Sequence, residues 1–67
     1  MNVLFLLKRF IDQPYSRSSQ AMETLSSRHG YSLLRVPDTF RKHADLDPWR
    51  INVMVNVEER IIGFRVG

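Results

Sequence analysis

Cysteine is absent from this 67-residue chain, and glycine and proline are scarce, with three of each. Without cysteine, the chain can form neither a disulfide framework nor a zinc site with thiolate ligands. The glycines stand apart at positions 30, 63 and 67, so the sequence contains no glycine-rich phosphate-binding loop. A chain of this length forms one small domain, which we place at residues 1–67, and it buries only about 60% of its unfolded surface.

Long apolar runs are also missing. The apolar run at residues 3–7 is shorter than the core of a signal peptide, and its basic pair, Lys8 and Arg9, follows it instead of preceding it. The run is far too short to span a bilayer. A helix on a membrane surface is the alternative to a helix packed on the core, which we prefer, so we expect no membrane partner. The lack of a signal pattern and of cysteine favours a cytoplasmic location.

The positive charge is modest and scattered. Ten Lys and Arg residues against seven Asp and Glu give a net charge of +3, spread from Lys8 to Arg65. Nucleic-acid binding normally needs a denser basic patch, so we expect no nucleic-acid partner.

The sequence also shows no recognisable set of catalytic residues. A nucleophile needs a base within hydrogen-bond reach, and the bases here are His29, at an expected helix end, and His43. His43 stands beside Asp45 and Asp47, but a single histidine among carboxylates in a loop is usually just solvated. We therefore predict no catalytic residue, no metal site, no cofactor and no enzymatic activity.

Two segments show helical spacing. Apolar residues in 3–11 predict a short first helix that ends before Pro14, although an alternating strand is the alternative. Residues 16–29 predict the main helix, capped by Ser16 or Ser18 and closed by Gly30 in a left-handed conformation. Its expected apolar stripe consists of Ala21, Met22 and Leu25.

Three segments read as strands, at residues 31–36, 51–57 and 61–66. The second alternates most regularly, which predicts one apolar face made of Ile51, Val53, Val55 and Val57. A short turn at 56–60 predicts an antiparallel hairpin, while the long connection before residue 51 permits parallel pairing. The fold class is therefore α+β, a small mixed three-stranded sheet with one main helix packed on one face.

The connection between the first two strands, at about 38–49, is predicted to be a long exposed binding loop. Pro37 and Pro48 argue against regular structure there, and connections this long tend to be functional. Trp49 is either an aromatic at the core edge, which we prefer, or a binding residue. Arg50 follows the loop and can reach back to Asp45 or Asp47.

Residues 43–53 (HADLDPWRINV), together with the closing 64–67 (FRVG), resemble the potato inhibitor I superfamily, and most closely its bacterial and fungal elastase-inhibitor branch. Residues 10–14 (FIDQP) and 34–37 (LRVP) resemble that branch's entry to its helix and its first strand. The chain departs from the family at His43, where Thr is common, and in lacking the cysteines of the branch. Asn52 stands where other members carry a second supporting arginine.

The resemblance implies a role for each matching position. Ala44 would fill the primary specificity pocket of a serine protease, and Ala44–Asp45 would be the reactive-site bond. The remaining contact residues would be Arg41, Lys42, His43, Leu46 and Asp47. Arg50 and Arg65 would support the loop.

The implied function is inhibition of a serine protease by a substrate-like mechanism. The small Ala44 implies elastase-like or subtilisin-like targets, and we expect a monomer. The resemblance also implies a secreted or periplasmic location, so the localisation stays open. The alternative function is a non-inhibitory protein–protein interaction module on the same fold.

Overall fold

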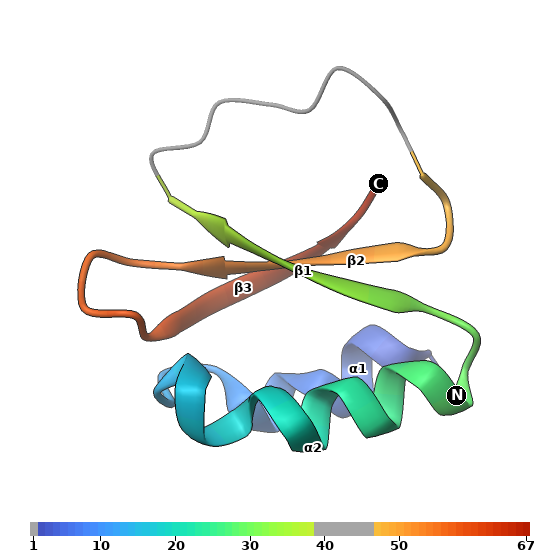
Figure 1. The fold of residues 1–67 in the computed structure, drawn as a ribbon, viewed down its shortest axis with the longest axis horizontal. Coiled ribbons are helices and arrows are strands. Elements are labelled where there is room, and N and C mark those ends of the chain that lie inside the picture. The colour runs from blue at the N-terminus through green and yellow to red at the C-terminus, as the bar shows by residue number, and fades with distance from the viewer. Residues whose placement is uncertain (1, 39–46) are drawn as a thin grey trace.

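The computed structural model describes residues 2–38 and 47–67, which form two short helical segments, one longer helix and three strands (Figure 1). In chain order the elements are α1 (Val3–Leu7), the 3-10 helix η1 (Lys8–Phe10), α2 (Tyr15–Arg28), β1 (Ser32–Pro37), β2 (Arg50–Val55) and β3 (Ile61–Val66). The predicted α+β fold class is confirmed.

The sheet has the strand order β1-β2-β3, with β1 and β2 parallel and β2 and β3 antiparallel. The parallel pairing and the hairpin both match the sequence prediction. Asn56 shapes the hairpin turn, because its Oδ1 accepts hydrogen bonds from the backbone N–H groups of Glu58 at 2.9 Å and Arg60 at 3.0 Å. Glu59, in the same turn, has a positive φ of 62°.

The first helix forms as predicted, and the alternative strand is wrong. Asn2 caps α1 by accepting a hydrogen bond from the Leu4 N–H at 2.8 Å. Val3 and Leu7 are spaced by four residues, so they share one face of α1 and are both buried. The helical conformation continues only through η1, before the chain reaches Pro14.

The main helix begins one residue earlier than predicted, and neither predicted serine caps it. Pro14 is its N-cap residue, and the first helical N–H, that of Tyr15, donates to the Glu59 carbonyl at 2.8 Å. Ser18 is buried and donates its hydroxyl to Gln13 Oε1 at 2.9 Å. Another segment of the chain thus satisfies the first amide, and the third, that of Arg17, donates to the Pro14 carbonyl at 3.2 Å, so no serine oxygen acts as the cap.

Gly30 ends α2 as predicted, with φ at +80°. The Gly30 N–H donates to the Ser27 carbonyl at 3.0 Å, and the Tyr31 N–H donates to the Ser26 carbonyl at 2.9 Å. This pair of bonds is a Schellman motif, which needs a left-handed residue at its centre. The motif turns the chain directly from α2 into β1.

Both helices lie on the same side of the sheet (Figure 1), and the core fills the space between the layers. Its buried apolar residues are Val3, Leu7, Met22, Ile51, Val53, Val55 and Ile61. The prediction for Val57 was wrong, because this residue is 93% exposed. The chain leaves the strand at Asn56 to form the turn, so the alternation ends at Val55.

The predicted stripe of α2 also needs correction. Met22 is fully buried and Leu25 half-buried, but Ala21 is exposed. The residues buried four positions before and after Met22 are Ser18 and Ser26. Their small side chains let the helix lie close to the sheet, so two polar residues occupy the inward-facing line.

Candidate functional site

The candidate site lies where the chain enters β2. Asp47 Oδ1 accepts a hydrogen bond from the Trp49 N–H at 2.9 Å, and the Asp47 carbonyl accepts one from the Arg50 N–H at 3.2 Å. Pro48 fixes φ in the middle of this turn. The turn delivers Arg50 to the first position of the strand in a defined conformation.

The last residue of the chain contacts the start of β2. The Gly67 N–H donates to the Arg50 carbonyl at 3.0 Å, and the Gly67 carbonyl accepts from Arg50 Nε, also at 3.0 Å. Asn52 Nδ2 donates to the same carbonyl. We call these three residues the Gly67 clasp. One backbone oxygen thus fixes two polar side chains that come from alternate positions of β2.

The clasp is on the face of the sheet opposite the helices. Side chains alternate along a strand, and Ile51, Val53 and Val55 face the helices, so Arg50 and Asn52 face away from them. Asn52 is nevertheless only 5% exposed, and Val36 on the same face is 7% exposed. This face is therefore shielded from water around Asn52, although neither helix covers it.

The Asn52 side chain has an acceptor that no other described residue satisfies. Its Oδ1 is buried and has no hydrogen-bond partner within the part of the chain that the structure describes. The orientation of the amide is fixed, because a flip would place this oxygen against the Gly67 carbonyl. A buried acceptor of this kind normally finds a donor, so Oδ1 is suited to receive an N–H group on this face of the sheet.

Trp49 lies exposed beside the entry to β2. Its side chain is 60% exposed, so the expectation of a core-edge residue was wrong. Its ring packs against Tyr31 with centroids 5.7 Å apart and an interplanar angle of 51°. The Trp49 carbonyl accepts a hydrogen bond from the Ser32 N–H at 2.9 Å. The backbone of the turn is thereby joined to β1 while the indole faces solvent.

Most of the predicted contact residues lie outside the described residues, namely Arg41, Lys42, His43, Ala44, Asp45 and Leu46. Asp47 and Arg50 are described and lie together in the turn that enters β2. Arg65 is exposed on β3, with its Cα paired to that of Asn52. It therefore lies on the same face of the sheet as the clasp.

Sequence reasoning missed the role of Gly67 and the burial of Asn52. Asn52 alternates with apolar residues, a pattern that normally places a polar side chain in water. Gly67 acts only through its backbone, and its φ of 132° is one that other residues rarely adopt. No local signal in the sequence marks Asn52 as buried, because the same alternation is typical of a strand with one solvated face.

Other kinds of site find no support in residues 2–38 and 47–67. No three His, Cys, Asp or Glu side chains of this part gather closely enough to hold a metal ion. None of its helices is both long and apolar enough to cross a membrane.

Comparison with known protein families found no family model that matches the chain. Comparison with curated proteins found no significant match.

Proposed function

We propose that this protein inhibits serine proteases by a substrate-like mechanism, in which the connection at 38–49 binds the protease active site as a substrate does and stays bound. Ala44 fills the primary specificity pocket, and Ala44–Asp45 is the bond aligned with the catalytic serine. The proposal rests on the resemblance of residues 43–53 to the potato inhibitor I superfamily. The described part of the chain adds independent support through the way it holds both ends of this connection.

Both ends of the connection are hydrogen-bonded to the sheet. The Asp38 N–H donates to the Val55 carbonyl at 2.8 Å, and the Trp49 carbonyl accepts from Ser32 at 2.9 Å. Because β1 and β2 are adjacent and parallel, the connection starts at one end of the sheet and returns to the other. An inhibitory loop needs two fixed ends of this kind.

The Gly67 clasp is the observation that carries the proposal furthest. It holds the Arg50 side chain on the face away from the helices, one residue after the proposed loop. A restrained support lowers the entropy that the loop loses when it binds a protease. It also keeps the new amine in place after cleavage, and a positioned amine re-forms the bond at a high effective concentration.

The chemistry of the loop indicates the target. Arg41, Lys42 and His43 lie on the acyl side of the bond, and Leu46 and Asp47 on the leaving side. An alanine fills only a shallow pocket, and each missing buried methylene forfeits about 0.8 kcal/mol in a deeper one. We therefore expect elastase-like and subtilisin-like proteases to be the targets.

Titration against elastase, subtilisin, chymotrypsin and trypsin tests the function. We expect stoichiometric inhibition of elastase or subtilisin, weaker inhibition of chymotrypsin and the weakest of trypsin. Mass spectrometry after long incubation should place the nick between Ala44 and Asp45. If trypsin is the best target, Lys42 or Arg41 fills the pocket instead. A folded chain that inhibits none of the four contradicts the proposal and favours the interaction module.

A further inference from the structure

Strand β1 forms one edge of the sheet and leaves backbone groups without a neighbouring strand. The Ser32 N–H donates to the Trp49 carbonyl just before β2, and the Asp38 N–H donates to the Val55 carbonyl at the end of β2. Successive residues of a strand point their backbone groups to alternate sides, so Leu33 and Arg35 direct theirs away from β2. No strand of the described sheet lies beyond this edge.

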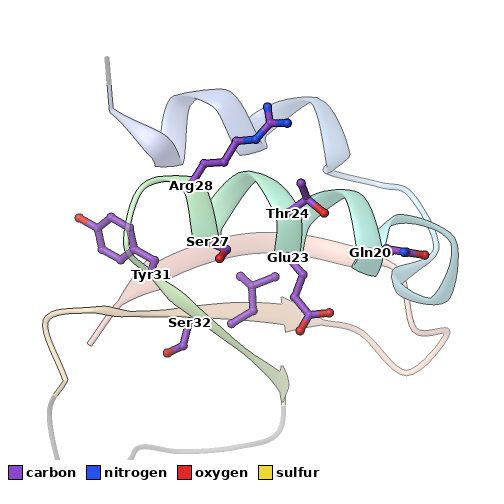
Figure 2. A pocket seen from close by; sticks show the side chains of 8 residues that line it. Gln20, Glu23, Thr24, Ser27, Arg28, Tyr31 and Ser32 are labelled. Carbon is purple, nitrogen blue, oxygen red and sulfur yellow. The ribbon is translucent and has the colours of Figure 1, made fainter.

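An open groove of about 730 Å³ runs between this edge and α2 (Figure 2). Leu33 lines it from β1, next to Tyr31 and Ser32. The lining residues that α2 contributes are Gln20, Glu23, Thr24, Ser27 and Arg28. A groove between a sheet edge and a helix is the arrangement in which an extended peptide adds a further strand and places alternate side chains against the helix.

The charge in the groove selects the peptide. The Glu23 side chain extends from α2 toward the strands, whereas the Arg28 side chain, which also lines the groove, extends away from the strands in this view (Figure 2). Glu23 is exposed and forms no hydrogen bond or ion pair with any other described residue. The nearest positive charge on the edge, Arg35, is held by Glu59 through two contacts of 2.7 Å. The carboxylate of Glu23 is thus a negative charge on the strand side of the groove that a ligand can pair with.

We propose that the β1 edge and the α2 groove bind an extended peptide strand that carries a Lys or Arg facing Glu23. The peptide runs antiparallel to β1, the slightly more stable pairing. It exchanges backbone hydrogen bonds with Leu33 and Arg35. Leu33 packs on the helix-covered side of the sheet, so the peptide residue opposite Leu33 projects toward the helix and meets Glu23.

This site is separate from the proposed reactive loop, so the two proposals can fail independently. Binding is measured by nuclear magnetic resonance on the ¹⁵N-labelled protein with the probe acetyl-Thr-Val-Lys-Val-Thr-amide. We expect saturable shifts confined to residues 20–28 and 31–36. Replacing the probe's Lys by Glu should weaken binding about tenfold, because its attraction to the Glu23 carboxylate becomes repulsion. Methylating the Lys backbone nitrogen should abolish binding, because that N–H donates to Leu33.

Charge reversal in the protein completes the test. Glu23→Lys should invert the preference, so that the Glu probe binds more tightly than the Lys probe. Glu58→Lys makes the same charge change in the exposed hairpin turn and should leave the preference intact. Melting temperatures of both variants confirm folding. No saturable shifts at millimolar probe, equal binding of the methylated probe, or an unchanged preference in Glu23→Lys would each overturn the proposal.

Discussion

On the face of β2 that the helices cover, Ile51, Val53 and Val55 are fully buried among apolar side chains. On the opposite face, Arg50 and Asn52 are held by hydrogen bonds to a single carbonyl, that of Gly67. The first face is stabilised by removing apolar area from water, which is not directional. The second depends on donor and acceptor geometry. Stability is therefore expected to depend on the first face, and the shape of the proposed loop on the second.

The largest effect is expected on the apolar face. Ile51→Ala should lower the free energy of unfolding by about 2–5 kcal/mol, because it removes a fully buried side chain and leaves a cavity. Urea denaturation measures the change. Ile62, which is 45% exposed on β3, provides the matched control. Ile62→Ala should stay within about 0.5 kcal/mol of the parent. Equal losses for both variants would mean that the core is not where the structure places it.

A substitution at Asn52 tests the polar face. Asn52→Asp replaces the donor to Gly67 by a carboxylate and should destabilise the fold by about 2–4 kcal/mol at neutral pH. Burial beside a carbonyl disfavours the ionised form, so the pKa of the new carboxyl is raised in the folded state. The loss should therefore shrink as the pH falls from the raised folded value toward about 3.9, the unfolded value, and should be smallest below it.

Urea denaturation of Asn52→Asp and the parent at pH 3 and pH 7 gives the difference. Asn52→Leu is the control, because it removes the amide without adding a titratable group and its cost should not vary with pH. A pH-independent cost for the aspartate variant would show that the Gly67 carbonyl does not demand a donor.

A smaller effect on stability, but a large one on inhibition, is expected at Arg50. Arg50→Ala removes one bond of the Gly67 clasp and should cost about 1 kcal/mol of stability. Under the proposed function, the loosened leaving segment escapes after cleavage, and the variant becomes a temporary inhibitor. A time course of protease activity at fixed inhibitor excess detects the recovery. Arg17→Ala, an exposed change on α2, should inhibit persistently. Persistent inhibition by Arg50→Ala would exclude the clasp as loop support.

The smallest effect is expected at the Arg35–Glu59 ion pair, which belongs to neither face. The hydrogen bond from Arg35 lowers the pKa of Glu59 below its ordinary value of 4.5. The stabilisation by the ion pair is therefore present above about pH 4.5. It is lost as the pH falls through the lower pKa that Glu59 has in the folded state. Glu59→Gln should flatten the stability profile below pH 4.5, whereas Glu58→Gln should not. Thermal melts from pH 2.5 to 7 measure the pH dependence of stability. Identical profiles for the two variants would show that the ion pair does not contribute to stability.

The hydrophobic periodicity and the turn residues of the sequence were sufficient to predict the helices and strands. The strand that begins near Ile51, the left-handed Gly30 and the turn at 56–60 are marked by local signals, and all three are seen in the structure. The error at the start of α2 occurred where a distant residue takes part. Glu59, far along the sequence, supplies the acceptor for the first amide of this helix.

The candidate site likewise has features with a local sequence signal and features that depend on distant residues. The position of Arg50 at the start of a strand was predictable from the sequence, and its bond to Gly67 was not, since the two are joined only by the hairpin. The burial of Asn52 depends on what covers the second face of the sheet, which no local pattern encodes. The residues at 39–46, which carry most of the predicted contacts, lie outside the described part of the chain.

The parallel pairing of β1 with β2 has a consequence for folding kinetics. The hairpin and the junction of α2 with β1 join neighbouring segments, so they can form early and locally. Every contact between β1 and β2, from Ser32 with Arg50 onward, instead requires closure of the connection at 38–49. Contacts of this separation slow folding, but doubling such a connection costs only about 0.6 kcal/mol of closure entropy. The fold can therefore accept loops of varied length and sequence with little loss of stability, and folding speed is the property that such changes would alter.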